Sequence, residues 1–275
     1  MIYETKIDNR GKFDIIKSEY LIEKPIISVV MSVFNGEDFL IEAIESILNQ
    51  TYKNFEFIII NDGSEDKSLN IIKQYHALDS RIILINQENI GLTKSLNRGI
   101  ELSRGEYIVR QDADDISLPD RISKQLSFIK TLSIDILGAQ AWVQSGRRLN
   151  ISPKTADVEG FANAHMMFGN PFVHGTLMFR AKVIKQHTYD EGIKYAQDYE
   201  LLCRCMSSGV GIAIVPEPLY ILRKHNESIS NRKSIEQYRI ASQIVMKYFG
   251  TSRYFMTGKN LVTKVFLHFL KKFYR

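Results

Sequence analysis

The feature that most constrains the fold is an alternation of short apolar runs with amphipathic helical patterns through the first half of the chain. The first run, 26–34 (IISVVMSVF), is almost continuously apolar and rich in β-branched residues, as in a strand buried on both faces. This alternation continues through three more strands. The expected strands are 55–60, 81–85 and 107–109, and the expected helices are 37–50, one from about 66 or 68 to 75, and 92–102. This order predicts an α/β fold with a doubly wound, mostly parallel sheet.

Polar side chains follow three of these strands. Asn35 comes after the first strand, Asp62 after the second, and the segment 110–115 (RQDADD) after the fourth. Ligands of doubly wound sheets bind beyond the carboxyl ends of the strands, so these residues predict a binding site. The chain has neither G-x-G-x-x-G nor G-x-x-x-x-G-K-[ST]. Their absence counts against nicotinamide dehydrogenases and P-loop NTPases.

The aspartates of this last segment allow two interpretations. Three carboxylates on one loop, Asp112, Asp114 and Asp115, repel one another unless a cation neutralises them. Mg²⁺ and Mn²⁺ prefer such oxygen ligands, and Mg²⁺ commonly combines one or two carboxylates with substrate phosphates. The alternative is a solvated acidic turn before the helix expected from Pro119. Asp62 is equally open, since Asp-Gly-Ser is a good turn and its carboxylate could also accept a hydrogen bond from a uracil ring N–H.

The second half is more mixed, with expected helices at 119–132 and 197–208. Its expected strands are 135–143, 175–180, 211–215 and 219–222. Cys203 and Cys205 are the only cysteines, and their side chains diverge on a helix. A disulfide between them is not expected, which is typical of a protein of the reducing cytosol.

Five segments of the first half resemble the donor half of family 2 glycosyltransferases with the GT-A fold, in both order and spacing. They are SVVMSVFNGEDFL, FIIINDGSEDKS, NIGLTKSLNRGI, GEYIVRQDADD and LPDRISKQLSFI. A weaker resemblance continues through NPFVHGTLMFR, AQDYELLCR and YILRKHNESIS to about residue 230. The resemblance implies a nucleotide-sugar donor, a divalent metal ion, and inversion at the anomeric carbon.

The same resemblance implies roles for single residues in donor binding. Asn35 and Asp62 fall where the family holds the nucleobase, usually uracil, and Lys94 lies in the segment that approaches the phosphates. Asp112 matches the first position of the Asp-x-Asp element, which faces the ribose or sugar. Asp115 extends this element.

Metal binding and catalysis fall on three further residues. Asp114 matches the second position of the Asp-x-Asp element, which would ligate Mn²⁺ or Mg²⁺, and His225 resembles a histidine that completes the coordination. A single histidine can equally be structural. Asp198 matches the base of the family's Glu-Asp motif, although Gln197 replaces the glutamate. Alternatively, or in addition, Asp198 caps the helix that follows.

Charge divides the chain into a body and a tail. The whole chain has 36 Lys and Arg and 31 Asp and Glu, a net charge of +5. From Ser228 to Arg275 there are ten cations and one acid, a balance of +9, so the rest carries −4. Within this tail the pattern of 261–273 predicts a basic amphipathic helix, which suits an anionic membrane surface or packing on the body. Nucleic acid is a poorer partner, because no binding motif is recognised.

These observations predict an N-terminal arm (1–25), a catalytic domain (26–230) with donor (26–134) and acceptor (135–230) halves, and a helical tail (231–275). The expected activity is transfer of a sugar to a saccharide or undecaprenyl-linked saccharide in O-antigen, capsule or exopolysaccharide synthesis. The resemblance implies a UDP-sugar as the donor, because UDP is the commonest carrier in the family. The expected location is the cytoplasm, with peripheral attachment to the inner face of the cell membrane. The alternatives are a sugar nucleotidyltransferase, whose glycine- and arginine-rich loop is missing, and a non-catalytic sugar- or lipid-binding subunit.

Overall fold

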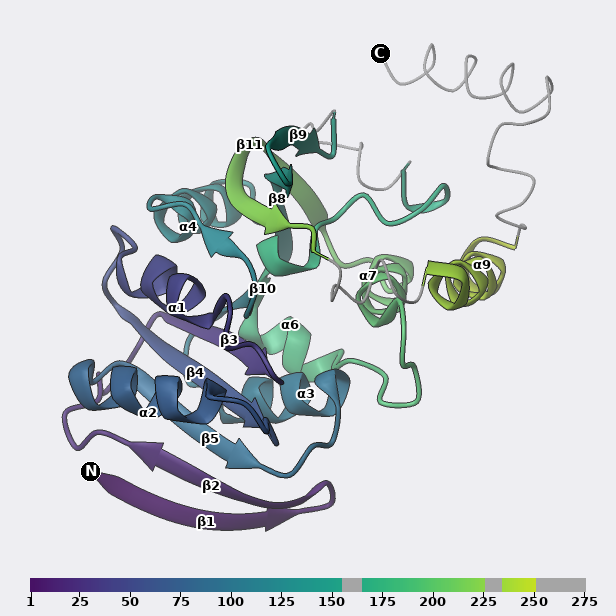
Figure 1. Ribbon diagram of the computed structural model, residues 1–275. Coiled ribbons are helices and arrows are strands. Elements are labelled where there is room, and N and C mark those ends of the chain that lie inside the picture. The colour runs from purple at the N-terminus through teal and green to yellow at the C-terminus, as the bar shows by residue number, and fades with distance from the viewer. Residues whose placement is uncertain (155–164, 226–233, 251–275) are drawn as a thin grey trace.

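A computed structural model describes residues 1–154, 165–225 and 234–250 of the chain. Its strands form one 11-stranded mixed sheet in the order β1-β2-β5-β4-β3-β6-β10-β8-β11-β7, and β9 pairs with β8. Helices cover both faces of this sheet (Figure 1). The α/β class expected from the alternating sequence pattern is confirmed.

The strands of the first half are β1 (Ile2–Asp8), β2 (Gly11–Lys17), β3 (Ile27–Val33), β4 (Phe55–Asp62), β5 (Ile82–Gln87), β6 (Tyr107–Asp112) and β7 (Ile116–Ser117), and its helices are α1 (Leu40–Leu48), α2 (Ser68–Leu78), α3 (Leu92–Leu102) and α4 (Arg121–Thr131). The strands of the second half are β8 (Ile136–Ser145), β9 (Arg148–Ser152), β10 (Met178–Arg180) and β11 (Ile212–Arg223), and its helices are η1 (His174–Thr176), α6 (Ala181–Gln186), α7 (Gln197–Ser207) and α9 (Ser234–Phe249).

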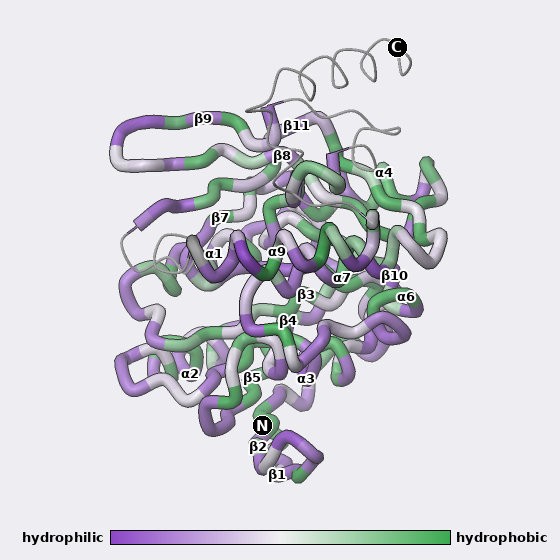
Figure 2. The backbone as a smooth tube through the Cα atoms, turned by 90° about the vertical axis from the view of Figure 1, so that its right-hand side faces the viewer, coloured by the Kyte–Doolittle hydropathy of each residue, from purple (hydrophilic) through white to green (hydrophobic). Residues whose placement is uncertain are grey.

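The centre of the sheet is parallel, as the sequence predicts. Strands β5, β4, β3 and β6 run side by side in parallel. Every residue of β4 is buried. Alternate residues of these strands enter two cores, because successive side chains point to opposite faces. Ile58 and Ile60 join the core with α3 and α7, and Phe57 and Ile59 join the core with α1 and α4. Figure 2 shows the hydrophobic residues concentrated on central strands such as β3 and β4.

The second half is antiparallel where it joins the centre. Strand β10 lies between β6 and β8 and is antiparallel to both. The expected strand 175–180 is therefore half right, since its first residues form the 3₁₀ helix η1. The two short strands expected at 211–215 and 219–222 are one strand, β11, with register shifts between Val215 and Tyr220. These irregularities let β11 stay paired with β8 along its whole length.

The segment 1–25, expected as an arm, contains a β-hairpin that belongs to the sheet. Strand β2 pairs antiparallel with β5, and β1 pairs with β2 at the outer edge. The buried Arg98 of α3 donates to Asp8 at 2.6 Å, and Arg10 donates to Glu101 at 2.8 Å. These two pairs fix the tip of the hairpin to α3.

The described part of the basic tail packs on the body. Helix α9 buries Ala241, Ile244 and Val245 in the core that also contains α7. The amphipathic helix expected at 261–273 lies outside the described residues. Among the described residues, no helix is both long enough and apolar enough to cross a bilayer.

Candidate functional site

The three aspartates lie where β6 ends: Asp112 is the last residue of β6, and Asp114 and Asp115 lie in the loop that leads to β7, so the segment 112–115 is called the aspartate loop. One oxygen of Asp112 accepts from Arg110 Nη2 at 2.6 Å, and its backbone N–H donates to the Tyr220 hydroxyl at 3.1 Å. Gly175 approaches the same point so closely that a Cβ there would lie 2.7 Å from Asp112 Oδ2. Groups from both halves of the domain therefore converge on Asp112.

Asp114 is paired with His225, which follows the end of β11. The Asp114 Oδ2 and His225 Nε2 atoms are 2.9 Å apart, and the imidazole packs on the Phe39 ring with centroids 4.8 Å apart. Burial raises the pKa of Asp114, and the nearby charge of Asp112 raises it further, while the hydrogen bond to His225 opposes the shift. The two predicted metal ligands are 111 positions apart in the sequence, and the fold brings them into contact.

Asp115 is the most enclosed of the three carboxylates. Its side chain is 1% exposed, and Oδ1 accepts from the backbone N–H of Arg223 at 2.8 Å. Oδ2 is buried and has no hydrogen-bond partner among the described residues. Burial raises the pKa of Asp115 well above its usual range, and the charges of Asp112 and Asp114 add to the effect. Such a cluster of destabilised carboxylates gains most from a bound cation.

These residues fit a divalent ion. Neighbouring ligands of an octahedral ion at about 2.0–2.1 Å lie about 3 Å from one another, so Asp114 Oδ2 and His225 Nε2 are already suitably spaced. Within the described ranges, no three His, Cys, Asp or Glu side chains are grouped to hold a metal. The remaining ligands would come from substrate phosphate and water, which is the usual arrangement for Mg²⁺.

At the end of β4, Asp62 is buried and held by a neighbouring loop. Its Oδ1 accepts from Gln87 Nε2 at 2.8 Å and from the Ile90 N–H at 2.9 Å, and its Oδ2 accepts from the Gly91 N–H at 2.9 Å. Asp62 therefore fixes the segment that leads into α3. Turn chemistry alone does not explain it, because the partners lie 25 to 29 residues away.

Asn35 and Lys94 lie on either side of this strand end. Asn35 has a left-handed backbone (φ 51°), and its side-chain oxygen accepts from the Glu65 N–H at 2.8 Å, which ties the loop after β3 to the loop after β4. Lys94 lies in the first turn of α3, and its charge helps to lower the pKa of Glu191, although hydrogen bonds from Asn97 and Arg10 lower it more.

Asp198 lies in the first turn of α7 and does not cap it. The N-cap is Ala196, without a side-chain cap, so the capping alternative is wrong. Asp198 Oδ2 instead accepts from Asn170 Nδ2 at 2.7 Å. The carboxylates of Asp198 and Asp112 both act on the pKa of His174, although burial, the largest cause, and the Arg110 charge lower it.

His174 and Tyr189 form a hydrogen-bonded pair in the second half of the chain. His174 Nε2 lies 2.7 Å from the Tyr189 hydroxyl, and burial raises the pKa of that hydroxyl above its usual range. The charges of Arg110, Asp112 and Asp198 also reach Tyr189. His174 is half-buried and Tyr189 is buried, and the carboxylates of Asp112 and Asp198 act on the pKa of both residues.

Arg110 is one residue of this site that was not predicted from the sequence. It is 3% exposed on β6, and its Nε and Nη1 are buried without a hydrogen-bond partner in the described part of the chain. A signal was present, because an arginine within the otherwise buried strand YIVRQD has no place in an apolar core. Its one polar side-chain contact within the described residues is Asp112.

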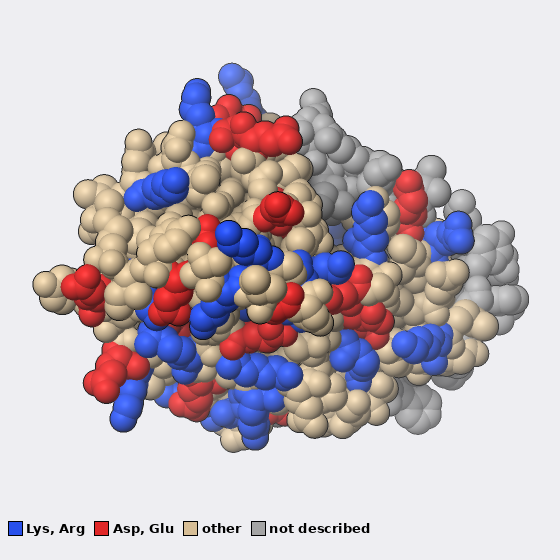
Figure 3. Space-filling view, turned by 90° about the horizontal axis from the view of Figure 1, so that it is seen from below, with Lys and Arg blue, Asp and Glu red and all other residues tan. Residues whose placement is uncertain are grey.

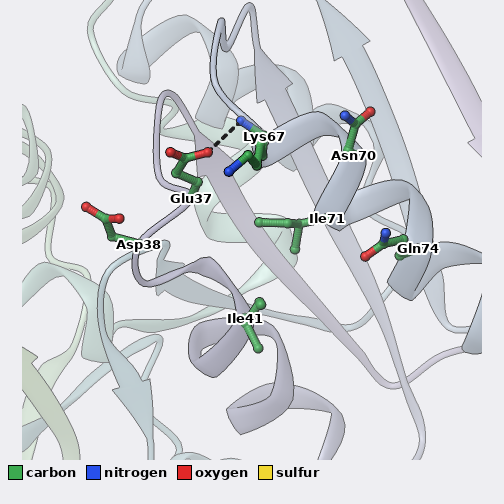
Figure 4. Close-up of a pocket in the computed structure, with 7 residues that line it drawn as sticks. All are labelled: Glu37, Asp38, Ile41, Lys67, Asn70, Ile71 and Gln74. Carbon is green, nitrogen blue, oxygen red and sulfur yellow. Dashed lines mark hydrogen bonds between the residues drawn. The ribbon is translucent and has the colours of Figure 1, made fainter.

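Two surface pockets of about 500 Å³ lie elsewhere. One separates α1 from α2, with Ile41 and Ile71 on opposite sides and the Lys67 N–H donating to Glu37 (Figure 4). The other lies between the segment 192–195 and α9. Neither is lined by a predicted site residue, so the site is defined by its converging side chains.

Known glycosyltransferases are similar to this chain along most of its length. An uncharacterised glycosyltransferase of Methanocaldococcus jannaschii is 35% identical over 89% of this chain and 84% of its own length. The O-antigen biosynthesis glycosyltransferase WbnJ of Escherichia coli is 31% identical, with 81% and 89% covered.

Two solved structures share the fold. Staphylococcus aureus TarS 1–349 in complex with UDP-GlcNAc has a TM-score of 0.67 at 19% identity, with 86% of this chain and 77% of that chain covered. The Pyrobaculum calidifontis mannosyltransferase PcManGT in complex with GDP-Man and Mn²⁺ has a TM-score of 0.65 at 15% identity, with 83% and 65% covered. The family model "Glycosyl transferase family 2" matches residues 28–191. The chain therefore belongs to glycosyl transferase family 2 and has the GT-A fold.

Proposed function

We propose that this glycosyltransferase is an inverting, divalent-metal-dependent enzyme. It moves a sugar from a nucleotide-diphospho-sugar, with UDP as the expected carrier, to an acceptor hydroxyl. The observation that carries this proposal is the pairing of Asp114 Oδ2 with His225 Nε2 at 2.9 Å, in the same segment as the buried Asp115. Such a group of side chains can hold a divalent ion against a leaving diphosphate, and Asp198, in the first turn of α7, offers a separate carboxylate that can act as a base.

The donor is assigned to the strand ends. Asn35 and Asp62 would hold the nucleobase, and Lys94, at the start of α3, would face the phosphates. The backbone of residues 90–91, fixed by Asp62, supports this reading, because it presents the N-terminus of α3, which attracts negative charge. UDP-GlcNAc in TarS and GDP-Man in PcManGT support a nucleotide-sugar as the donor class.

Asp114 and His225 would hold the metal ion, with Asp112 beside the ribose or sugar and Asp115 behind them. Mn²⁺ or Mg²⁺, when bound, supplies Lewis-acid neutralisation of the leaving diphosphate. Mn²⁺ in PcManGT supports this assignment. Arg110 holds the Asp112 carboxylate in one orientation through its 2.6 Å bond.

Asp198 is assigned the role of general base. The acceptor hydroxyl is a weak nucleophile, so its proton must pass to a carboxylate as its oxygen attacks the anomeric carbon. The bond from that carbon to the diphosphate breaks on the opposite face, which inverts the configuration. Asn170 donates to Asp198 Oδ2, and Oδ1 would take the proton from the acceptor hydroxyl.

Two observations support the choice of acceptor: the process in which a similar enzyme acts, and the positive charge of the tail. WbnJ acts in O-antigen biosynthesis, and the basic tail of this chain suits an anionic surface. We assign a lipid-linked saccharide, reached at the cytoplasmic face of the membrane.

The test is a panel of UDP-, GDP- and dTDP-sugars, each incubated with the full-length protein and Mn²⁺, with slow hydrolysis measured as release of free nucleotide diphosphate. We expect one carrier class to be hydrolysed, EDTA to abolish the reaction, and Mn²⁺ or Mg²⁺ to restore it. Full activity after exhaustive chelation would refute the metal assignment. Donor binding by calorimetry with no hydrolysis and no transfer to any acceptor would show a non-catalytic binding protein instead.

A further inference from the structure

The two ends of the sheet differ in how much open strand edge they expose. At one end β7 has two residues, so it presents few backbone N–H and C=O groups with which another strand could pair. At the other end β1 has seven residues, and no strand of the described residues lies beyond it (Figure 1). Three of its side chains are large, apolar and exposed, namely Ile2 (39%), Tyr3 (61%) and Ile7 (79%). A long, open edge that exposes apolar side chains is a template for another strand.

The hairpin register determines which backbone groups of β1 are open. Asp8 pairs with Gly11 across a two-residue turn, so this closing pair exchanges hydrogen bonds. Antiparallel pairs alternate between bonded and non-bonded, so the even-numbered residues of β1 bond to β2. The N–H and C=O groups of Tyr3, Thr5 and Ile7 therefore point away from the sheet.

The sequence of this edge is complementary to itself. An antiparallel second copy centred on Thr5 places Thr5 opposite Thr5 and Tyr3 opposite Ile7, and all of these are residues with outward backbone groups. The same register places Glu4 opposite Lys6 on the other face. Aromatic with β-branched, threonine with threonine, and acid with base are the cross-strand pairs that stabilise a sheet.

We propose that two copies of this chain associate through β1, as antiparallel strands related by a twofold axis at Thr5, and join their sheets into one. Charge supports a second copy as the occupant. Figure 3 shows the face that carries this edge, where Lys and Arg are interleaved with Asp and Glu and neither sign dominates. Such a face does not select a strongly acidic or basic partner, but it complements a copy of itself.

The hairpin is anchored well enough to present this edge. Asp8 is bonded to the buried Arg98 at 2.6 Å, and Phe13 and Ile15 of β2 are 5% exposed in the core. Strands β2, β5 and β4 lie between β1 and β3, so association at this edge leaves the aspartate loop open. The pairing does not depend on which sugar the enzyme transfers.

The test is sedimentation velocity of the full-length protein over a range of concentrations, with Thr5→Pro as the diagnostic variant. Proline removes the outward N–H of Thr5, but none of the bonds between β1 and β2, and edge strands tolerate it. Thr5→Val is the matched control, because it loses the hydroxyl bond to Asp14 yet keeps the N–H. We expect wild type and Thr5→Val to dimerise and Thr5→Pro to raise the dissociation constant about tenfold or more, with an unchanged melting temperature.

Charge reversal provides a second measurement. Glu4→Lys and Lys6→Glu should each weaken the dimer, because like charges then face each other, and the double variant should restore it. A wild-type monomer at all concentrations would overturn the proposal. A dimer that survives Thr5→Pro unchanged would also overturn it, because association would then use another surface.

Discussion

The donor half and the acceptor half supply polar groups to the site in different ways. The donor half uses the ends of adjacent parallel strands, and its side chains are held by its own loops, as Asp62 is by Gln87 and the 90–91 backbone. The acceptor half supplies single groups from a helix and from the end of a strand, such as Asp198 and His225. The donor half is thus a rigid frame whose polar groups also maintain the fold. Among the described residues, the Asp198 carboxylate accepts one hydrogen bond from a side chain, whereas the Asp62 carboxylate accepts three hydrogen bonds.

The largest expected effect tests the acceptor half. Asp198→Asn keeps the size of the side chain but removes the base, so kcat should fall by about 10²- to 10⁴-fold. Because Asp198 lies in the first turn of α7 and has one hydrogen bond from a side chain, the melting temperature should change little. Asp120→Asn, at an exposed acid of the donor half, is the control and should retain the wild-type rate. Near-normal turnover of Asp198→Asn with intact donor binding would remove the base assignment.

The donor half should respond in stability as well as in activity. Asp62→Asn turns one acceptor oxygen into a donor facing Gln87, Ile90 or Gly91, and at 2% exposure water cannot compensate. The expected loss is about 2 to 3 kcal/mol, which is about 4 to 12 °C in melting temperature. Thermal unfolding measures it. An unchanged melting temperature would break the contrast between the two halves, because Asp62 would then have no structural role.

The contact between the halves should be sensitive to one methyl group. Gly175→Ala would place a Cβ against the Tyr220 hydroxyl and 2.7 Å from Asp112 Oδ2. Displacing the hydroxyl should lower the free energy of unfolding by about 1 to 2 kcal/mol. It should also weaken donor binding, because the hydroxyl accepts a hydrogen bond from the Asp112 N–H and so helps to position that residue. Calorimetric titration with the donor and Mn²⁺ measures the second effect. Donor binding as tight as that of the wild type would show that Asp112 does not depend on this contact.

The regular elements were the most predictable part of the fold. The helix expected at 92–102 coincides with α3, and the strand expected at 26–34 contains β3. Both have strong local patterns that burial alone enforces. The hairpin of residues 2–17 was missed, because its strands mix charged and apolar residues and gain their order from β5.

The candidate site was predictable where it follows strand ends. Asp62 and Asp112 end β4 and β6, and parallel register brings such ends together. Arg110 and the His174–Tyr189 pair were not predicted as site residues. Arg110 is identified by its buried nitrogen atoms, and His174 and Tyr189 are joined by a contact between residues 15 positions apart.

By itself, the sequence determined the alternation of strand and helix, the parallel core and the polar residues at its carboxyl edge, because periodicity and burial are local properties of a chain. Only the tertiary structure decided that His225 reaches Asp114, that Asp198 accepts from Asn170 rather than capping α7, and that β1 is the outer strand of the described sheet. Such contacts join residues far apart in sequence. Their geometry depends on how whole elements pack, and no local pattern encodes it.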